Sequence, residues 1–232
     1  MQPAAVIFDL DETLFDHRGA ALAGVRAWLA ELGEAASDEL TGLWFSLEER
    51  YVRAWHRGEL SFAEQRRERI REMLATVGRD GADDAALDAS FARYLLRYEA
   101  GWRRFDDVDD ALADVAAAGL RVAVLTNGAE RQQNQKLSAV DLAGRVGPVF
   151  CCDALGFAKP DARAYELVCE RLDMSPARVL HVGDRHDLDV VAARDAGLSA
   201  VHLDRDDRGP LGERARISSL RELGPFLASR DG

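Results

Sequence analysis

The chain has 232 residues, of which 47% are hydrophobic, 31% charged and 7% aromatic. This apolar fraction is too high for a disordered chain, and the length suffices for one large domain or a domain carrying an insertion. The 41 acidic and 30 basic residues give a net charge of −11, which excludes an overall basic surface for nucleic acid or an anionic membrane and leaves a local patch open.

Targeting and redox signals are absent from the sequence. No apolar run approaches the roughly 18–20 residues needed to span a bilayer, and no basic segment precedes Asp9 and Asp11. Three cysteines, two of them adjacent (Cys151 and Cys152), form neither a disulfide framework nor a CxxC motif, so we expect buried thiols. We therefore expect a cytoplasmic protein with no nucleic-acid or membrane partner, and the choice between monomer and homodimer stays open.

Five short apolar runs are predicted as β-strands. They are nearly continuous in apolar character, which is typical of strands buried on both faces of a sheet. From the second run onward, helical stretches separate them, and this alternation predicts a Rossmann-like parallel α/β sheet of about five strands with helices on both faces. The runs are residues 4–8, 121–125, 148–152, 178–182 and 200–203.

The first two strands are separated by an unusually long segment. About 110 residues lie between them, whereas a parallel crossover needs only about a dozen. Residues 107–118 can supply the crossover helix, which leaves an insertion that reads as helical throughout. Within it, Ser61 and Glu64 form the pattern of a capping box at the start of one helix. The sequence therefore predicts a core domain of residues 1–15 and 101–232, interrupted by a helical domain of residues 16–100.

The C-terminal tail from Asp204 onward is rich in charge. Its apolar residues are spaced as on one face of a helix, so we expect a last helix docked on the core. These residues are Ile217, Leu220, Leu223 and Phe226.

Chemically capable residues follow four of the five predicted strands. In a parallel sheet the carboxyl ends of the strands meet at one edge, where ligands bind. Taken singly, each residue has a structural explanation as a helix cap or a turn. Their coincidence at one edge favours a shared site. In chain order they are Asp9, Asp11, Thr126, Asn127, Gly128, Lys159, Asp184, Asp187 and Asp189.

The chemistry of this set points to phosphoryl transfer. Asp9, Asp11 and Asp184, brought together, would repel one another unless a cation lay between them, and hard carboxylate oxygens favour Mg²⁺ over zinc. The Thr126 hydroxyl, the backbone amides around Gly128 and the Lys159 ammonium suit phosphate oxygens. The chain has no GxxxxGK[ST] motif, which disfavours a P-loop nucleotide triphosphatase.

With these residues in order, the chain resembles the haloacid dehalogenase-like (HAD) hydrolases, and within them the Mg²⁺-dependent phosphatases with a helical cap inserted after the first strand. The resemblance covers residues 6–13 and 107–203. It implies that Asp9 is the nucleophile that forms an aspartyl-phosphate and that Asp11 is the general acid and base. It implies a small phosphorylated metabolite as substrate, and a helical cap that closes over it.

The resemblance also implies the roles of the remaining residues. Thr126, Asn127, Gly128 and Lys159 would bind the phosphoryl group. Mg²⁺ would be held by Asp184, the Asp9 carboxylate and the Asp11 backbone carbonyl. Asp189 or Asp187 would be the carboxylate of the outer metal shell.

Two positions depart from the usual pattern of the family. Glu12 stands where glycine is commonest, which could alter the turn after the nucleophile. Leu188 takes a place often held by asparagine, and this leaves the outer metal shell less defined. His17 is a weak candidate for substrate contact.

Other activities stay open. Dehalogenases of the same core carry a different residue at the Asp11 position, so Asp11 favours phosphate chemistry over theirs, and a sugar-phosphate mutase remains compatible with the core. Phosphonate-cleaving members use a cap lysine, and the insertion has none. Two further alternatives belong to other functional classes. A phosphorelay receiver domain would lack the helical insertion. A binding protein without catalytic activity would be expected to have lost at least one of the acidic residues or the lysine.

Overall fold

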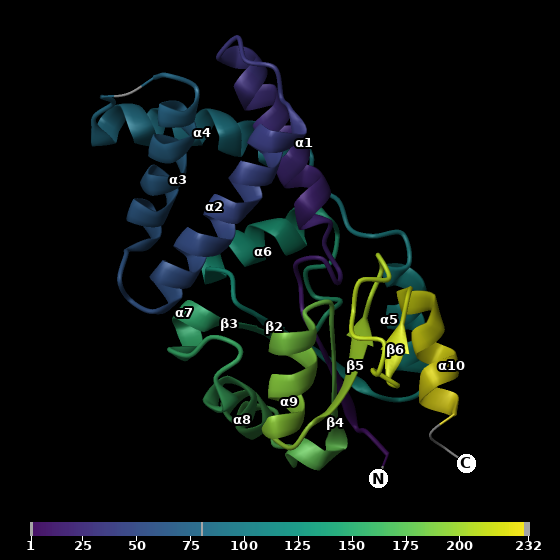
Figure 1. Ribbon diagram of the computed structural model, residues 1–232. Coiled ribbons are helices and arrows are strands. Elements are labelled where there is room, and N and C mark those ends of the chain that lie inside the picture. The colour runs from purple at the N-terminus through teal and green to yellow at the C-terminus, as the bar shows by residue number, and fades with distance from the viewer. Residues whose placement is uncertain (1, 80, 230–232) are drawn as a thin grey trace. The chain divides into compact units, whose positions relative to one another are not determined.

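The computed structural model describes residues 2–79 and 81–229, and the chain divides into two compact units. The core unit comprises the described residues up to Asp16 and from Arg103 onward. The helical unit comprises residues 17–102, His17 to Trp102. Figure 1 shows the elements of both units, and each is described by itself below.

The core unit is built on a parallel sheet. Within the described residues the sheet has six strands in the order β3-β2-β1-β4-β5-β6, and every pairing in it is parallel. The five predicted strands are confirmed, with ends that differ by no more than one residue. The strands are β1 (Ala5–Phe8), β2 (Arg121–Thr126), β3 (Val149–Cys151), β4 (Val179–Gly183), β5 (Ser199–Leu203) and β6 (Arg216–Ile217).

The sixth strand lies in the tail, where a helix was expected. Ile217 belongs to β6, which pairs with His202 and Leu203 of β5. The strand has two residues, one of them an arginine, so it leaves no apolar run that the sequence could reveal. The predicted last helix follows as a 3₁₀ turn (Leu220–Glu222) and α10 (Leu223–Ala228).

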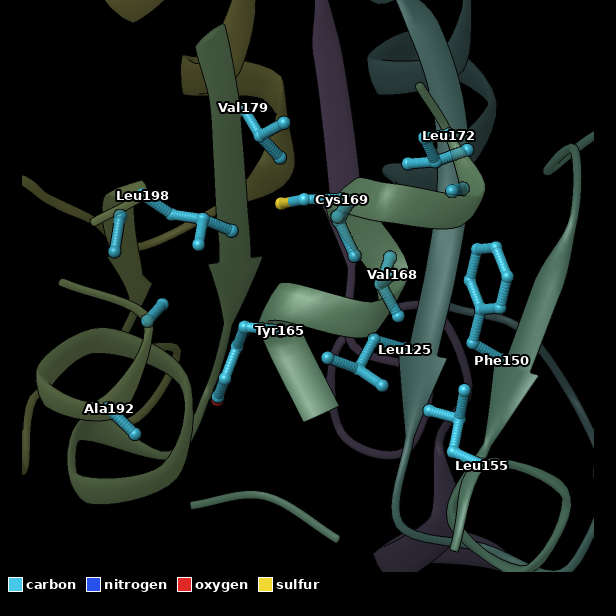
Figure 2. Packing of buried hydrophobic residues seen from close by; sticks show 14 of the residues in the cluster. Leu125, Phe150, Leu155, Tyr165, Val168, Cys169, Leu172, Val179, Ala192 and Leu198 are labelled. Carbon is cyan, nitrogen blue, oxygen red and sulfur yellow. The ribbon is translucent and has the colours of Figure 1, made fainter. Parts of the chain in front are cut away.

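Helices cover both faces of the sheet. Leu125 of β2 packs in one apolar cluster with Tyr165 and Val168 of α8, as Figure 2 shows. The strand residues that alternate with this set, such as Val6 and Val124, are also fully buried, so the opposite face is covered as well. The core helices are α5 (Val108–Ala117), α6 (Glu130–Ala139), α7 (Cys152–Leu155), α8 (Ala162–Arg171), α9 (Ala192–Asp195) and α10.

A buried carboxylate fastens the tail to the core. Asp107 accepts hydrogen bonds from both terminal nitrogens of Arg205 (2.7 and 2.9 Å), from Ser219 Oγ (2.8 Å) and from the Leu220 amide (2.9 Å). Burial opposes the charge of this group, but these donors outweigh it and lower the pKa of Asp107. The carboxylate therefore stays ionised and holds the tail through four bonds.

Asp107→Asn should destabilise the protein by about 3 kcal/mol, because it leaves the Arg205 guanidinium without its charged partner. Chemical denaturation at neutral pH measures this as a lower midpoint. Asp106→Asn is the matched control, since the Asp106 side chain is 89% exposed and should be nearly neutral. Equal midpoints for the two variants would show that Asp107 does not fasten the tail.

The described residues of the helical unit form four helices. Ser61 and Glu64 make the predicted capping box at the start of α3, with Ser61 Oγ accepting from the Glu64 amide and Glu64 Oε2 from the Ser61 amide. Trp28, Trp44 and Tyr94 pack as a buried aromatic core. The helices are α1 (His17–Glu31), α2 (Asp38–His56), α3 (Phe62–Thr76) and α4 (Asp84–Ala100).

His17 is held within this unit, where its ring nitrogens lie 2.9 Å from Tyr98 Oη and 3.1 Å from Glu48 Oε2. The three cysteines are buried free thiols, as expected. No helix in the described part of either unit is long and apolar enough to cross a membrane.

Candidate active site

The candidate site lies at the carboxyl edge of the central strands. β1 is flanked by β2 and β4, so the residues that follow these three strands lie next to one another. Asp9 follows β1, Thr126 ends β2, and Asp184 follows β4. The topology therefore brings together residues that are up to 175 positions apart in the sequence.

Lys159 is the ammonium at the centre of the site. Its Nζ lies 2.6 Å from Asp9 Oδ1 and 2.6 Å from Asp189 Oδ1, and all three side chains are buried. A buried lysine flanked by two carboxylates is stabilised in its charged form. The attraction of Asp189 and Asp9 outweighs the effect of burial and raises the pKa of Lys159.

The carboxylates differ in how readily they ionise. Burial, reinforced by Asp189 and Asp11, raises the pKa of Asp9 to about 7 in spite of Lys159. Burial and the charges of Asp9 and Asp189 raise the pKa of Asp184 well above its ordinary range. Burial also acts on Asp189, but Lys159 and His181 outweigh it and lower its pKa. Asp189 is thus the carboxylate most firmly ionised.

The structure separates the two residues proposed for the outer metal shell. Asp189 is buried; its Oδ1 accepts from His181 Nε2 (3.0 Å) as well as from Lys159, and its Oδ2 accepts from the Arg185 amide (3.0 Å). Gly183 permits this approach, because a Cβ there would lie 2.3 Å from Asp189 Cγ. The Asp187 side chain is 63% exposed and faces Arg185. Only Asp189 lies in the cluster.

The cluster fits a divalent cation. One oxygen each from Asp9, Asp184 and Asp189 lies within 4.8 Å of the others. Three ionised carboxylates against one ammonium leave two negative charges. Burial is the main cause of the raised pKa values of Asp9 and Asp184, and repulsion among the carboxylates adds to it. Oxygen donors of this kind suit Mg²⁺. Both oxygens of Asp189 already accept hydrogen bonds, so Asp9 and Asp184 are better placed for direct contact with a metal.

The Thr126 hydroxyl is oriented by two donors. Gln133 Nε2 lies 2.7 Å from Thr126 Oγ1, and the Gly128 amide lies 3.2 Å from it. Because a hydroxyl has two lone pairs and one proton, two incoming donors direct its proton elsewhere. Gly128 also makes room for this arrangement, since a Cβ there would lie 2.1 Å from Gln133 Nε2. Thr126 is therefore prepared to donate to a bound anion.

Asp11 is held by helix α6. Its Oδ1 lies 2.6 Å from Lys136 Nζ, and its Oδ2 accepts from Gln133 Nε2 at 2.9 Å. The side chain is 31% exposed, so the carboxylate is fixed and yet reachable. The turn that follows it includes Glu12 at φ 65°, in the left-handed region that glycine adopts with the least strain.

Asn127 supports the site through its side chain. Its Oδ1 accepts from the Lys159 amide and its Nδ2 donates to the Lys159 carbonyl, each at 2.7 Å. The side chain thereby fixes the backbone of Lys159, and a direct bond between Asn127 and phosphate stays a prediction.

Three side chains of the site were not identified from the sequence: Gln133, Lys136 and His181. Polar residues on a helix usually form its solvated face, so the pattern of α6 gave no reason to bury two of them. The available signal was composition, because Lys136 and Lys159 are the only lysines of the chain. Both are buried at the site.

Mg²⁺ should stabilise the folded protein by about 2.7 kcal/mol at a hundredfold excess over its Kd. The shift in Tm should be larger at pH 8 than at pH 6. The pKa of Asp9 is raised to about 7, so below that pH a proton competes with the metal for the carboxylate. Thermal unfolding with and without EDTA measures both effects.

Two variants test where the metal binds. Asp184→Asn should remove the Mg²⁺-dependent shift in Tm, and Asp187→Asn should retain it. A shift in Tm that is unchanged in Asp184→Asn would show that the metal binds elsewhere.

Known proteins resemble this chain over most of its length. A family model described as haloacid dehalogenase-like hydrolase matches residues 3–197. The phosphoserine phosphatase of Thermus thermophilus is 32% identical over 207 residues, which cover 87% of this chain and 77% of that protein. The (S)-2-haloacid dehalogenase 4A of Burkholderia cepacia is 31% identical over 128 residues, 53% of this chain and 55% of that protein.

A solved structure shares the fold. The HAD-hydrolase YfnB from Bacillus subtilis, in a crystal structure bound to magnesium, superposes with a TM-score of 0.84 at 22% identity, over 98% of this chain and 100% of that chain. The family match covers far more than half of the sequence and agrees with the parallel sheet and its site at the carboxyl edge. The chain belongs to the haloacid dehalogenase-like hydrolases.

Proposed function

We propose that this hydrolase is a Mg²⁺-dependent phosphatase that cleaves a small phosphorylated metabolite through an aspartyl-phosphate on Asp9. The observation that carries the proposal is the second carboxylate, Asp11, which α6 holds two residues after Asp9. An alkoxide leaving group needs a proton, whereas a halide does not, so a positioned Asp11 is useful for phosphate esters. The related phosphoserine phosphatase supports the same substrate class.

The residues of the site can divide the reaction into two steps. An Asp9 carboxylate oxygen attacks phosphorus as the ester P–O bond breaks, and Asp11, which must be protonated for this step, gives its proton to the departing oxygen. The products are an aspartyl-phosphate, the free alcohol and an ionised Asp11. Asp11 then takes a proton from the water that attacks this intermediate, and Asp9 is released with inorganic phosphate. The Thr126 hydroxyl and the Lys159 ammonium hold the phosphoryl oxygens, and Asp189 and His181 keep the ammonium in place.

Asp9 and Asp184 would hold Mg²⁺, with the Asp11 backbone carbonyl as the further ligand that the family resemblance suggests. When bound, the metal would offset the charge of the carboxylates and of the phosphoryl group. The helical unit, residues 17–102, is proposed to act as the cap that selects the substrate.

Release of inorganic phosphate from p-nitrophenyl phosphate tests the proposal directly. Activity should require Mg²⁺, stop on addition of EDTA and return with excess Mg²⁺. A panel of small phosphate esters that includes phosphoserine then locates the substrate class. Folded protein that releases no phosphate from any of them in the presence of Mg²⁺ would contradict the proposal.

A second candidate activity is dehalogenation, because (S)-2-haloacid dehalogenase 4A matches about half of the chain. Chloride release from 2-chloropropionate distinguishes the two activities. A chain that released chloride and no phosphate would be a dehalogenase.

A further inference from the structure

Two buried polar side chains of α6 have no part in the reaction steps above. Gln133 is 1% exposed and Lys136 is 3% exposed. They are three residues apart on one helix, so both side chains lie on the same face. That face is turned to the site, because both side chains contact Asp11.

The amide of Gln133 joins two groups of the site. Its Nε2 donates one N–H to Asp11 Oδ2 (2.9 Å) and is 2.7 Å from Thr126 Oγ1, which accepts the other. A carboxylate only accepts hydrogen bonds, and this fixes which end of the amide faces Asp11. One side chain thus sets the distance between the group that transfers the proton and a group that holds phosphate.

Lys136 holds the other oxygen of the same carboxylate. Its Nζ lies 2.6 Å from Asp11 Oδ1 and 4.8 Å from the centre of the Phe15 ring. The two oxygens of Asp11 are therefore bound by different donors, and rotation about either side-chain bond would break at least one contact. A short carboxylate held in this way keeps one rotamer.

We propose that Gln133 and Lys136 are positioning residues, which hold Asp11 in the orientation for proton transfer. The inference rests on the proposed phosphatase function and deepens it. Proton transfer needs the donor within hydrogen-bond distance of the departing oxygen, so an Asp11 that changes rotamer loses its effect. The loss should grow with the basicity of the leaving group, because p-nitrophenolate leaves with little help and an alkoxide does not.

The experiment compares kcat/KM for ethyl phosphate and p-nitrophenyl phosphate in Gln133→Leu and Lys136→Met. We expect a fall of about 10²-fold for ethyl phosphate and of less than about tenfold for p-nitrophenyl phosphate. Gln135→Leu and Arg131→Met, at exposed positions of the same helix, are the matched controls and should change neither value. An equal fall for both substrates would overturn the proposal, because it would indicate damage to phosphate binding or to the fold.

A second arm does not depend on activity. Asp11→Ala leaves the buried Lys136 ammonium without this partner, so it should lower Tm, and adding Lys136→Met should restore part of the loss. If the change in Tm of the double variant equalled the sum of the two single changes, Asp11 and Lys136 would not interact, and the positioning role would be overturned.

The two arms together separate the inference from the proposed function. If the wild type released no phosphate while the effects of Asp11→Ala and Lys136→Met on Tm were coupled, the proposed function would fail and the contact would be structural only. If phosphate were released and the changes were additive, the positioning inference alone would fail.

Discussion

Replacing Asp9 with asparagine should lower kcat for phosphate release by about 10⁴-fold or more, the scale of loss when an enzyme's nucleophile is removed. An amide oxygen is a poor nucleophile, and the amide keeps the size and shape of the carboxyl. Steady-state assays with p-nitrophenyl phosphate and Mg²⁺ measure the loss. Mass spectrometry after acid quenching should find a phosphoryl group on the Asp9 peptide of the wild type and none on that of the variant.

The Tm of Asp9→Asn shows whether the loss of activity comes from the missing nucleophile or from unfolding of the protein. The pKa of Asp9 is raised to about 7, so above that pH the folded, metal-free protein carries an unfavourable charge in the cluster. Asp9→Asn removes this charge, and its metal-free Tm at pH 8 should be no lower than that of the wild type. Asp187→Asn removes an exposed carboxylate near the site and should retain full activity. An Asp9→Asn variant with a tenth of wild-type activity would rule out Asp9 as nucleophile.

Lys159→Met should lower both activity and stability, and its effect on stability should be the largest of the substitutions considered. It leaves Asp9 and Asp189, both buried, without the ammonium that lies 2.6 Å from each. Removing one partner of a buried ion pair typically costs about 3–5 kcal/mol. If Lys159 binds the phosphoryl group as proposed, loss of its cation should also lower kcat by about 10²-fold or more. Chemical denaturation and steady-state kinetics measure the two effects on the same sample.

Arg163→Met is the matched control for Lys159→Met. It removes a cation of similar reach from α8, only four residues along the chain, but its side chain is 63% exposed and pairs with Asp161. We expect changes below about 1 kcal/mol and unaltered kinetics. Mg²⁺ added to Lys159→Met should recover part of the stability, because it supplies positive charge to the same cluster. A Lys159→Met variant as stable as Arg163→Met would show that the carboxylates do not depend on the ammonium.

The fold was largely predictable because its central strands are buried on both faces. Such strands must be apolar at nearly every position, so β1 and β4 stand out in the sequence. β6 does not, since a strand of two residues at the sheet edge has Arg216 as half its length. Pairing with β5, in which Leu203 lies opposite Ile217, defines it, and this pairing is not visible in the sequence.

The site was predictable where residues directly follow strands, because topology alone brings Asp9, Thr126 and Asp184 together. The choice between Asp187 and Asp189 was not, because residues 186–191 form a π-helical turn. Its wider turn changes which residues face inward, so spacing counted on an α-helix does not apply. On this turn Val190 is fully buried, whereas the neighbouring Val191 is 44% exposed.

Both lysines of this chain, Lys136 and Lys159, lie at the candidate site, and the other 28 of its 30 lysine and arginine residues are arginines. Protein prepared with ¹⁵N-lysine would therefore give two backbone amide resonances, from Lys136 and Lys159. The Lys159 amide donates to Asn127 Oδ1 at 2.7 Å, and the Lys136 amide lies within α6, so the two would differ in environment. Metal and phosphate binding could then be followed by nuclear magnetic resonance at the site, with every other residue silent.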